Sequence, residues 1–188
     1  MPSSPRLWAN PPGNSPLPLP NGPVWFTANE LVELSFPKMP EKGEVSLDDL
    51  RDYVGRFRLE NEKTLSEVED LSKRRPLLVA GELANPYRLC DIAAPDMPLI
   101  PVRLENICRT WADNLDSRDV SPGIHHVTIA KSPGWWERSF ITLLELPDMK
   151  KLVSWLDGQR PGTWAPKRLA DGVIRLENDM DLMPPSID

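Results

Sequence analysis

The stretch that decides the fold runs from Ile124 to Leu146 and reads IHHVTIAKSPGWWERSFITLLEL. Its two ends, residues 124–130 and 139–146, are rich in β-branched and large apolar side chains, which predicts a strand at each end. Between them, residues 131–136 contain Pro and Gly in adjacent positions, a combination typical of turns. Because strands joined by so short a connection pair antiparallel, we expect a β-hairpin here.

Further elements are predicted on both sides of this hairpin. Residues 76–81 form a short continuous apolar run, as in a buried strand. Residues 102–115 place apolar side chains at helical spacing. After the hairpin, residues 148–158 predict an amphipathic helix and residues 173–176 a last strand. The order strand, helix, strand, strand, helix, strand predicts an α+β fold with the ferredoxin-like split βαβ arrangement, an antiparallel sheet with two helices on one face.

The chain before this domain divides into two parts. Eight of the 22 prolines fall within residues 1–23, which predicts a disordered leader. The alternative is a docking peptide in which Trp8 and residues 17–20 lie in a groove of a partner. Residues 24–75 predict helices, because Ser46 and two stretches with capping-box spacing, 27–30 and 64–67, each precede apolar residues at helical spacing.

We therefore expect four regions. They are a Pro-rich disordered leader (1–23), a helical N-terminal region (24–75), the ferredoxin-like domain (76–180) and a flexible tail (181–188).

Part of this domain resembles the RNA recognition motif family. The resemblance is carried by residues 123–130, by residues 138–146 and by the helix that ends Trp155-Leu156-Asp157-Gly158, and residues 77–83 look like the first strand of that family. The family stacks bases on aromatic side chains of its first and third strands. Here the first strand has no aromatic side chain and the third offers only Phe140. The resemblance therefore implies this fold with protein binding in place of RNA binding. The domain is also similar to the dimeric α+β barrel group, which is built from the same order of strands.

Charge and composition exclude several classes of function. Lys and Arg total 22 against 28 Asp and Glu, a net charge of −6, which argues against a general phosphate-binding surface. No apolar run approaches about 18 residues, so we expect no membrane association, and the start of the chain has no signal-peptide pattern. Two cysteines form no disulfide framework. We expect an intracellular protein, cytoplasmic or nuclear.

Catalytic and metal-binding signals are weak. His125 and His126 are adjacent on an expected strand, so their side chains point to opposite faces. We expect them to have packing or surface roles, with a general base or ligand as the alternative. Cys108 is expected to be a small buried apolar residue and Cys90 a more exposed one. The sequence predicts no catalytic residues, no metal site and no cofactor.

Aromatic and basic residues give the stronger signal. Two tryptophans occupy the expected hairpin tip and a third lies in a later loop, with arginines and lysines nearby. Exposed tryptophan at a loop is typical either of a lid over the core or of a binding hot spot. The candidate binding residues are Trp135, Trp136, Arg138, Phe140, Trp164, Lys167 and Arg168.

We accordingly expect a non-catalytic protein-interaction module that acts as an adaptor, regulator or inhibitor of a larger protein or nucleoprotein complex. One alternative is a protein that binds single-stranded RNA or DNA. A further alternative is a small enzyme of the dimeric α+β barrel type that uses His125 or His126. A protein partner is expected, a nucleic acid is the alternative, and a homodimer is left open.

Overall fold

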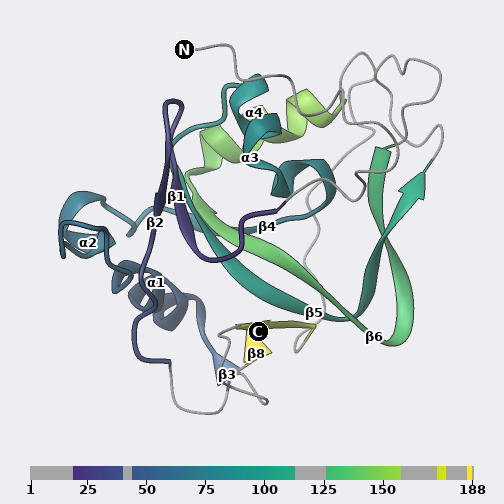
Figure 1. Cartoon of the computed structure of the whole chain (residues 1–188), viewed down its shortest axis with the longest axis horizontal. Coiled ribbons are helices and arrows are strands. Elements are labelled where there is room, and N and C mark those ends of the chain that lie inside the picture. Colours follow the sequence, from purple (N-terminus) through teal and green to yellow (C-terminus); the bar gives the residue numbers. More distant parts are fainter. Residues whose placement is uncertain (1–18, 40–43, 113–125, 158–172, 177–185, 188) are drawn as a thin grey trace.

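The computed structural model of the chain describes residues 19–39, 44–112, 126–157, 173–176 and 186–187. Eight strands lie in these parts: β1 (Val24–Phe26), β2 (Leu31–Glu33), β3 (Glu44–Val45), β4 (Arg75–Val79), β5 (Met97–Ala112), β6 (His126–Leu144), β7 (Ile174–Leu176) and β8 (Ser186–Ile187). The helices are α1 (Leu47–Gly55), α2 (Leu65–Val68), α3 (Pro86–Asp91) and α4 (Leu146–Asp157), with a 3₁₀ turn at Gly81–Ala84. The chain is therefore an α+β protein (Figure 1).

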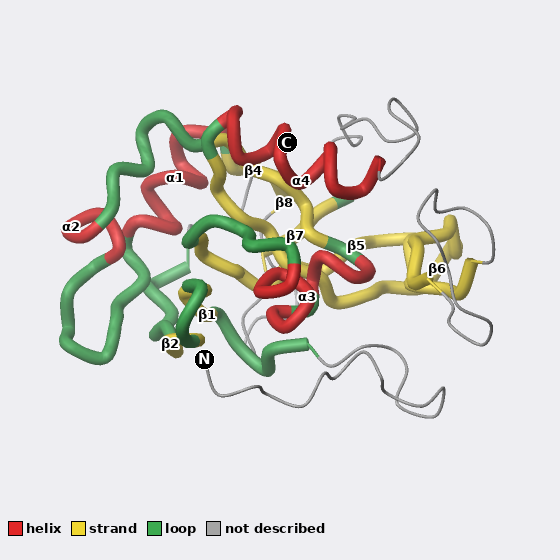
Figure 2. The backbone as a smooth tube through the Cα atoms, turned by 90° about the horizontal axis from the view of Figure 1, so that it is seen from above, coloured by secondary structure: helices red, strands yellow, loops and turns green. Residues whose placement is uncertain are grey.

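The sheet is built around one long antiparallel pair, β5 and β6. On the outer side of β6 lies β4, also antiparallel. The other edge of β5 pairs first with β1, which continues to β2, and further along with β7, which continues to β8 and β3. Among the described strands the β3–β8 pair alone is parallel. Figure 2 shows the β5–β6 ribbon extending away from the helices.

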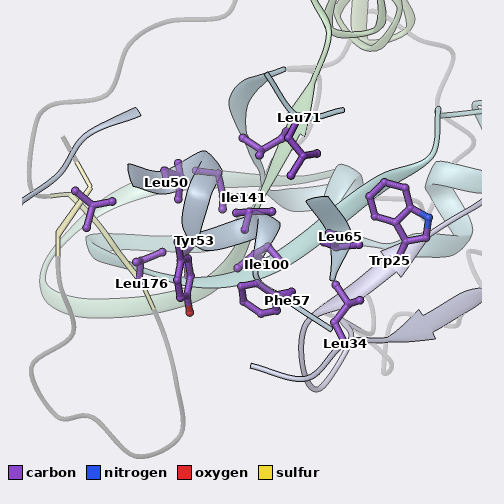
Figure 3. Close-up of a cluster of buried hydrophobic side chains, with 14 of the residues drawn as sticks. Trp25, Leu34, Leu50, Tyr53, Phe57, Leu65, Leu71, Ile100, Ile141 and Leu176 are labelled. Carbon is purple, nitrogen blue, oxygen red and sulfur yellow. The ribbon is translucent and has the colours of Figure 1, made fainter. Parts of the chain in front are cut away.

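The sheet is covered by helices on both faces. One core cluster joins alternate sheet residues such as Ile100 and Ile141 to Tyr53 and Phe57 from α1 and the segment after it (Figure 3). The other joins the intervening sheet residues, such as Phe140, to side chains of α3 and α4. Each large apolar side chain buried in this way contributes about 1.5–3 kcal/mol. The sheet face opposite α3 and α4 is therefore covered by α1 and α2.

Helix α1 begins where the sequence places it. The Ser46 hydroxyl accepts a hydrogen bond from the backbone N–H of Asp49, and the Asp49 carboxylate accepts from the Ser46 N–H, which completes a capping box. The helix ends at Gly55, where an added Cβ would lie 3.2 Å from the Cβ of Ser66. Glycine therefore lets α1 pack closely against α2.

The helix expected over residues 102–115 is wrong, because residues 102–112 belong to strand β5; residues 113–115 lie outside the described residues. Val102 and Leu104 are buried on one face and Arg103 lies between them, which is the period of a strand. Regular pairing is interrupted at Asn106, whose positive φ shifts the alternation by one residue, so that the next side chain packed against this core is Ile107. The apolar residues Val102, Leu104 and Ile107 are therefore spaced two and then three residues apart, which resembles the spacing along one face of a helix.

The expected hairpin turn at residues 131–136 is also wrong. Residues 126–144 form the single strand β6, and both of its halves pair with β5. The Pro-Gly pair does break the regular pairing, but it produces a bulge within the strand and not a chain reversal.

The first expected N-terminal helix is replaced by the β1–β2 hairpin. The Thr27 hydroxyl accepts hydrogen bonds from the backbone N–H groups of Asn29 and Glu30, which closes a turn of four residues. Residues 24–26 favour a strand, so no helix begins after Thr27. The S/T-x-x-E spacing at residues 27–30 stabilises the turn of a hairpin here. Helix α3 lies between β4 and β5, where the sequence predicts no element; Asn85 caps this helix, which begins with Pro86.

Other predicted elements are confirmed with shifted ends: α1, a short α2, β4, α4 and β7. The ferredoxin-like arrangement is not confirmed, because it requires a helix where β5 lies. Ser186–Ile187, within the expected flexible tail, form β8. Residues 1–18 of the expected Pro-rich leader (1–23) lie outside the described residues.

Candidate functional site

The candidate site is a bulge in the β5–β6 ribbon, here called the Trp bulge and defined as residues 131–136 of β6 with Asn106 of β5. Glu105 pairs with Trp136 and Ile107 pairs with Lys131, so residues 132–135 lie opposite the single residue Asn106. Residues 132–135 are therefore part of strand β6, and β6 pairs with β5 on both sides of them.

Two residues with positive φ shape the Trp bulge. Asn106 has φ of 59° and Gly134 has φ of 79°, a conformation that asparagine tolerates and glycine adopts freely. The Asn106 side-chain Oδ1 accepts a hydrogen bond from the Gly134 backbone N–H at 2.8 Å. This cross-strand contact ties the extruded residues to β5 and fixes the position from which the next two side chains project.

Those two side chains are the most exposed of the large apolar side chains in the described parts of the chain. Trp135 is 58% exposed and Trp136 is 51% exposed. The expectation that these rings form a lid over the core does not fit this exposure. Adjacent exposed indoles on an anchored bulge have the composition of a binding hot spot, since tryptophan is enriched there.

A row of three arginines crosses the sheet beside Trp136. Arg138 of β6 pairs with Arg103 of β5, which pairs in turn with Arg175 of β7. Directly paired residues project from the same face of a sheet, and Trp136 lies on that face because it is two residues from Arg138. This arginine row therefore borders the Trp bulge.

Polar contacts hold the row together. The Glu105 carboxylate lies 2.8 Å from Arg103 Nε and 3.6 Å from Arg175 Nε. The Arg103 guanidinium carbon lies 5.6 Å from the centre of the Trp136 ring, within cation–π range. Arg138 donates a hydrogen bond to the Asn21 carbonyl at 3.2 Å. One indole is thus braced by the row, while more than half of its surface stays accessible.

The structure brings together part of the predicted site. Trp135, Trp136 and Arg138 lie at the Trp bulge and the row beside it. Phe140 is fully buried in the core with α3 and α4, so we correct its assignment as a binding residue. Trp164, Lys167, Arg168 and His125 lie outside the described residues, and His126 is described by its backbone alone.

Sequence reasoning missed Arg103, Glu105, Asn106 and Arg175. The signal available was the alternation Val102-Arg103-Leu104-Glu105, which places two apolar side chains on one face and two charged ones on the other. Reading this segment as a helix hid the alternation, and pairing across three strands is not visible in one sequence.

A second surface feature is a polar groove of about 750 Å³ between α1 and the segment from Ser66 to Ser72. Arg51 lies along it, with its guanidinium 2.9 Å from the Asp48 carboxylate and its Nε donating to the Arg74 carbonyl at 2.8 Å. Its acidic lining residues are Asp48, Asp52, Glu67, Glu69 and Asp70.

The cysteines and carboxylates of the described segments gather into no cluster that could hold a metal ion. Cys90 lies on α3 and Cys108 on β5, and both are free thiols. Burial, and then the neighbouring Asp91 carboxylate, raise the pKa of the Cys90 thiol. Within the described part of the chain, each helix is too short or too polar to cross a membrane.

Comparison with known proteins gives no family assignment: no family model, no curated protein and no solved structure matches this chain.

Proposed function

We propose that this chain is a non-catalytic protein-interaction module that docks onto a partner protein through the Trp bulge. The observation that carries the proposal is the exposure of two adjacent indoles, 58% and 51%, on a bulge that hydrogen bonding fixes to the neighbouring strand. Docking would bury these rings, and a fully buried tryptophan at an interface centre contributes 2 kcal/mol or more.

Preorganisation supports the same proposal. A docking side chain on a mobile loop loses conformational freedom when it binds, and this loss weakens association. Here the Asn106–Gly134 hydrogen bond and the contact of Arg103 with Trp136 already restrict both the backbone and one ring. The Trp bulge thus presents its rings in a defined geometry, as an adaptor, regulator or inhibitor of a larger complex requires.

The free thiols of Cys90 and Cys108 fit an intracellular site of action, because cysteines stay reduced there. We therefore propose that the partner is an intracellular protein or nucleoprotein complex.

A second candidate function is binding of single-stranded nucleic acid, and the arginine row next to Trp136 favours it. Stacking of bases on tryptophan together with phosphate contacts to arginine is the usual chemistry of such proteins. This candidate predicts affinity that falls steeply with salt, since phosphate contacts release counterions.

Capture from a nuclease-treated lysate of the source organism tests the proposal. The full-length chain would be compared with a Trp135→Ala/Trp136→Ala variant and with Tyr87→Ala as the matched control. Tyr87 is an exposed aromatic residue on α3, so its removal measures the effect of losing an exposed ring elsewhere.

We expect proteins that the wild type and the Tyr87 variant capture and that the double tryptophan variant loses. Capture by the wild type and the Tyr87 variant that occurs in untreated lysate and is lost after nuclease treatment would favour the nucleic-acid candidate. Capture by the double tryptophan variant equal to that of the wild type, with its fold intact by circular dichroism, would refute docking through the Trp bulge.

A further inference from the structure

One end of the sheet has an open edge. Strand β2 (Leu31–Glu33) is the last strand there, and within the described part of the chain it pairs with β1 alone. Leu31 is 44% exposed and Glu33 is also exposed, while Val32 is half-buried against the core on the α1 side of the sheet. An open edge of this kind offers backbone groups to which a further strand can bind.

The direction of these backbone groups follows from the pairing of β2 with β1. The N–H of Leu34 donates to the Pro23 carbonyl at 3.0 Å, on the β1 side. Hydrogen bonding alternates along an antiparallel pair, so the N–H and C=O of Val32 also point toward β1. The N–H and C=O groups of Leu31 and Glu33 therefore point outward, and no described residue supplies them with a hydrogen-bond partner.

The next outward position along this edge already carries a strand-like partner. The N–H of Ser35 donates to the Arg58 carbonyl at 2.9 Å, and the N–H of Arg58 donates to the Ser35 carbonyl at 3.3 Å. This pair is an antiparallel bridge, so the edge has the geometry for antiparallel pairing at that point. The bridge covers one residue of the edge, and the outward groups of β2 remain open beside it.

The charge of the open edge is negative. Glu30 and Glu33 are exposed, and no described residue forms an ion pair with either carboxylate. The Arg58 guanidinium lies 3.2 Å from the Glu62 carboxylate, so its charge is already balanced. A basic side chain opposite Glu33 would therefore meet a carboxylate that is available for pairing.

We infer that the outer edge of β2 binds an extended basic segment of a partner protein as an added antiparallel strand. Backbone hydrogen bonds to Leu31 and Glu33 hold the segment, and its alternate side chains give specificity. Opposite charges on paired residues stabilise a sheet, so Lys or Arg lies opposite Glu33 and an apolar residue lies opposite Val32. A second copy of β2 fits less well, because it would add two more carboxylates to the same edge. This site is separate from the Trp bulge and goes beyond the docking function proposed above.

NMR titration of the isotope-labelled full-length chain tests the inference. The probe is the blocked peptide Thr-Lys-Val-Lys-Val-Thr, and the control probe is Thr-Glu-Val-Glu-Val-Thr. Chemical shifts and hydrogen exchange of the Leu31 and Glu33 amides report pairing at the open edge. The Val32 amide, which points toward β1, is the internal control.

Two pairs of variants separate the backbone from the charge. Leu31→Pro removes an outward N–H, which an edge strand tolerates, and Leu31→Thr keeps that N–H while also removing the apolar side chain. Glu33→Lys reverses the charge of the edge. Its matched control is Asp52→Lys, which reverses an exposed carboxylate of the polar groove beside α1.

We expect the lysine peptide to shift the amide resonances of Leu31 and Glu33 and to slow their exchange, with little change at Val32. Glu33→Lys should weaken binding about fivefold or more, because a favourable cross-strand pair becomes a repulsive one. Leu31→Pro should abolish binding, while Leu31→Thr and Asp52→Lys should keep most of the affinity. A dispersed spectrum of each variant verifies that it is folded.

Several results would overturn the inference. They are no change at the Leu31 and Glu33 amides, equally tight binding of the glutamate peptide, and wild-type affinity of the Leu31→Pro variant. Equal loss in Asp52→Lys and Glu33→Lys would assign the peptide to the polar groove instead. Changes at the same two amides that depend on protein concentration without peptide would assign the edge to a second copy of the chain. The double tryptophan variant tests docking through the Trp bulge independently of these results.

Discussion

Asn106 is the residue on which the geometry of the Trp bulge depends. It adopts a positive φ on β5, and its side chain accepts the hydrogen bond from Gly134 across the ribbon. A strand interior normally disfavours such a conformation, so the residue type matters. Asparagine combines tolerance of this backbone with a side chain that can hold the facing strand.

Two substitutions at this position separate its two roles. Asn106→Gly keeps the backbone free but removes the hydrogen bond, which should cost about 0.5–1.5 kcal/mol of unfolding free energy. Asn106→Ala removes the bond and adds backbone strain, so it should cost about 1–3 kcal/mol more. Urea unfolding measures both values. Equal stability of the two variants would show that the positive φ at position 106 carries no cost.

Acidic caps give the chain a pH dependence that can also be predicted at single residues. Hydrogen bonds from the Ser46 side chain and backbone lower the pKa of Asp49 from its ordinary value of 3.8. Hydrogen bonds from the Thr64 backbone and side chain lower the pKa of Glu67 from 4.5. A pKa that is lower in the folded state adds stability above the ordinary pKa, and this stability is lost as pH falls through the folded pKa.

The Asp49→Asn/Glu67→Gln variant should therefore be less stable than the wild type at neutral pH. The difference in unfolding free energy should shrink as the pH falls from about 5 to about 2, where the wild-type carboxylates become protonated. Chemical unfolding over this pH range measures the difference. A gap that stays constant or widens on acidification would contradict the assignment of these caps.

Among the helices and strands, those that depend on contacts between residues close in sequence could be predicted from the sequence. Ser46 begins α1 as its capping pattern indicates, and residues 76–79 form a strand as their continuous apolar run indicates. Strand β5 was misread because its bulge shifts the alternation at Asn106 into a spacing close to helical. A periodicity count cannot tell a strand whose alternation shifts by one residue from a helical spacing.

The same misreading explains what could be predicted of the site. Trp135, Trp136 and Arg138 stand out as residue types beside a Pro-Gly pair, so sequence alone singled them out. Arg103 and Arg175 join them through pairing of strands that are far apart in the chain. Phe140 was misassigned because its strand alone does not show that α3 and α4 cover this end of the face that also carries Arg138.

Phe140 gives a direct test of the two-sided core. It is fully buried between β6 and the α3–α4 side. Phe140→Ala should reduce the unfolding free energy by about 3–5 kcal/mol, as large-to-small substitutions in a core do. Thermal or urea unfolding measures this loss. A variant with unchanged stability would return Phe140 to the surface and restore its assignment as a binding residue.

In the whole molecule, helices cover both faces of the central sheet, and the β5–β6 ribbon carries the Trp bulge (Figure 2). Around Phe140 and Ile141 both faces of the sheet are covered, whereas Trp136, further along β6, is exposed. Among the described residues, the indoles of Trp135 and Trp136 are the most exposed large apolar side chains. We propose that the body of the protein holds this surface in place for docking.

The measurement that tests this account most directly is site-specific photo-crosslinking in cells of the source organism. A photoreactive residue at Lys131, which lies in the Trp bulge and is exposed, keeps both tryptophans intact; the control is the same residue at Lys151, an exposed position on α4. We predict that position 131 forms a discrete protein adduct that Trp135→Ala/Trp136→Ala abolishes, and that position 151 does not form it. An adduct that persists in the tryptophan variant, or that forms equally from position 151, would contradict docking through the Trp bulge.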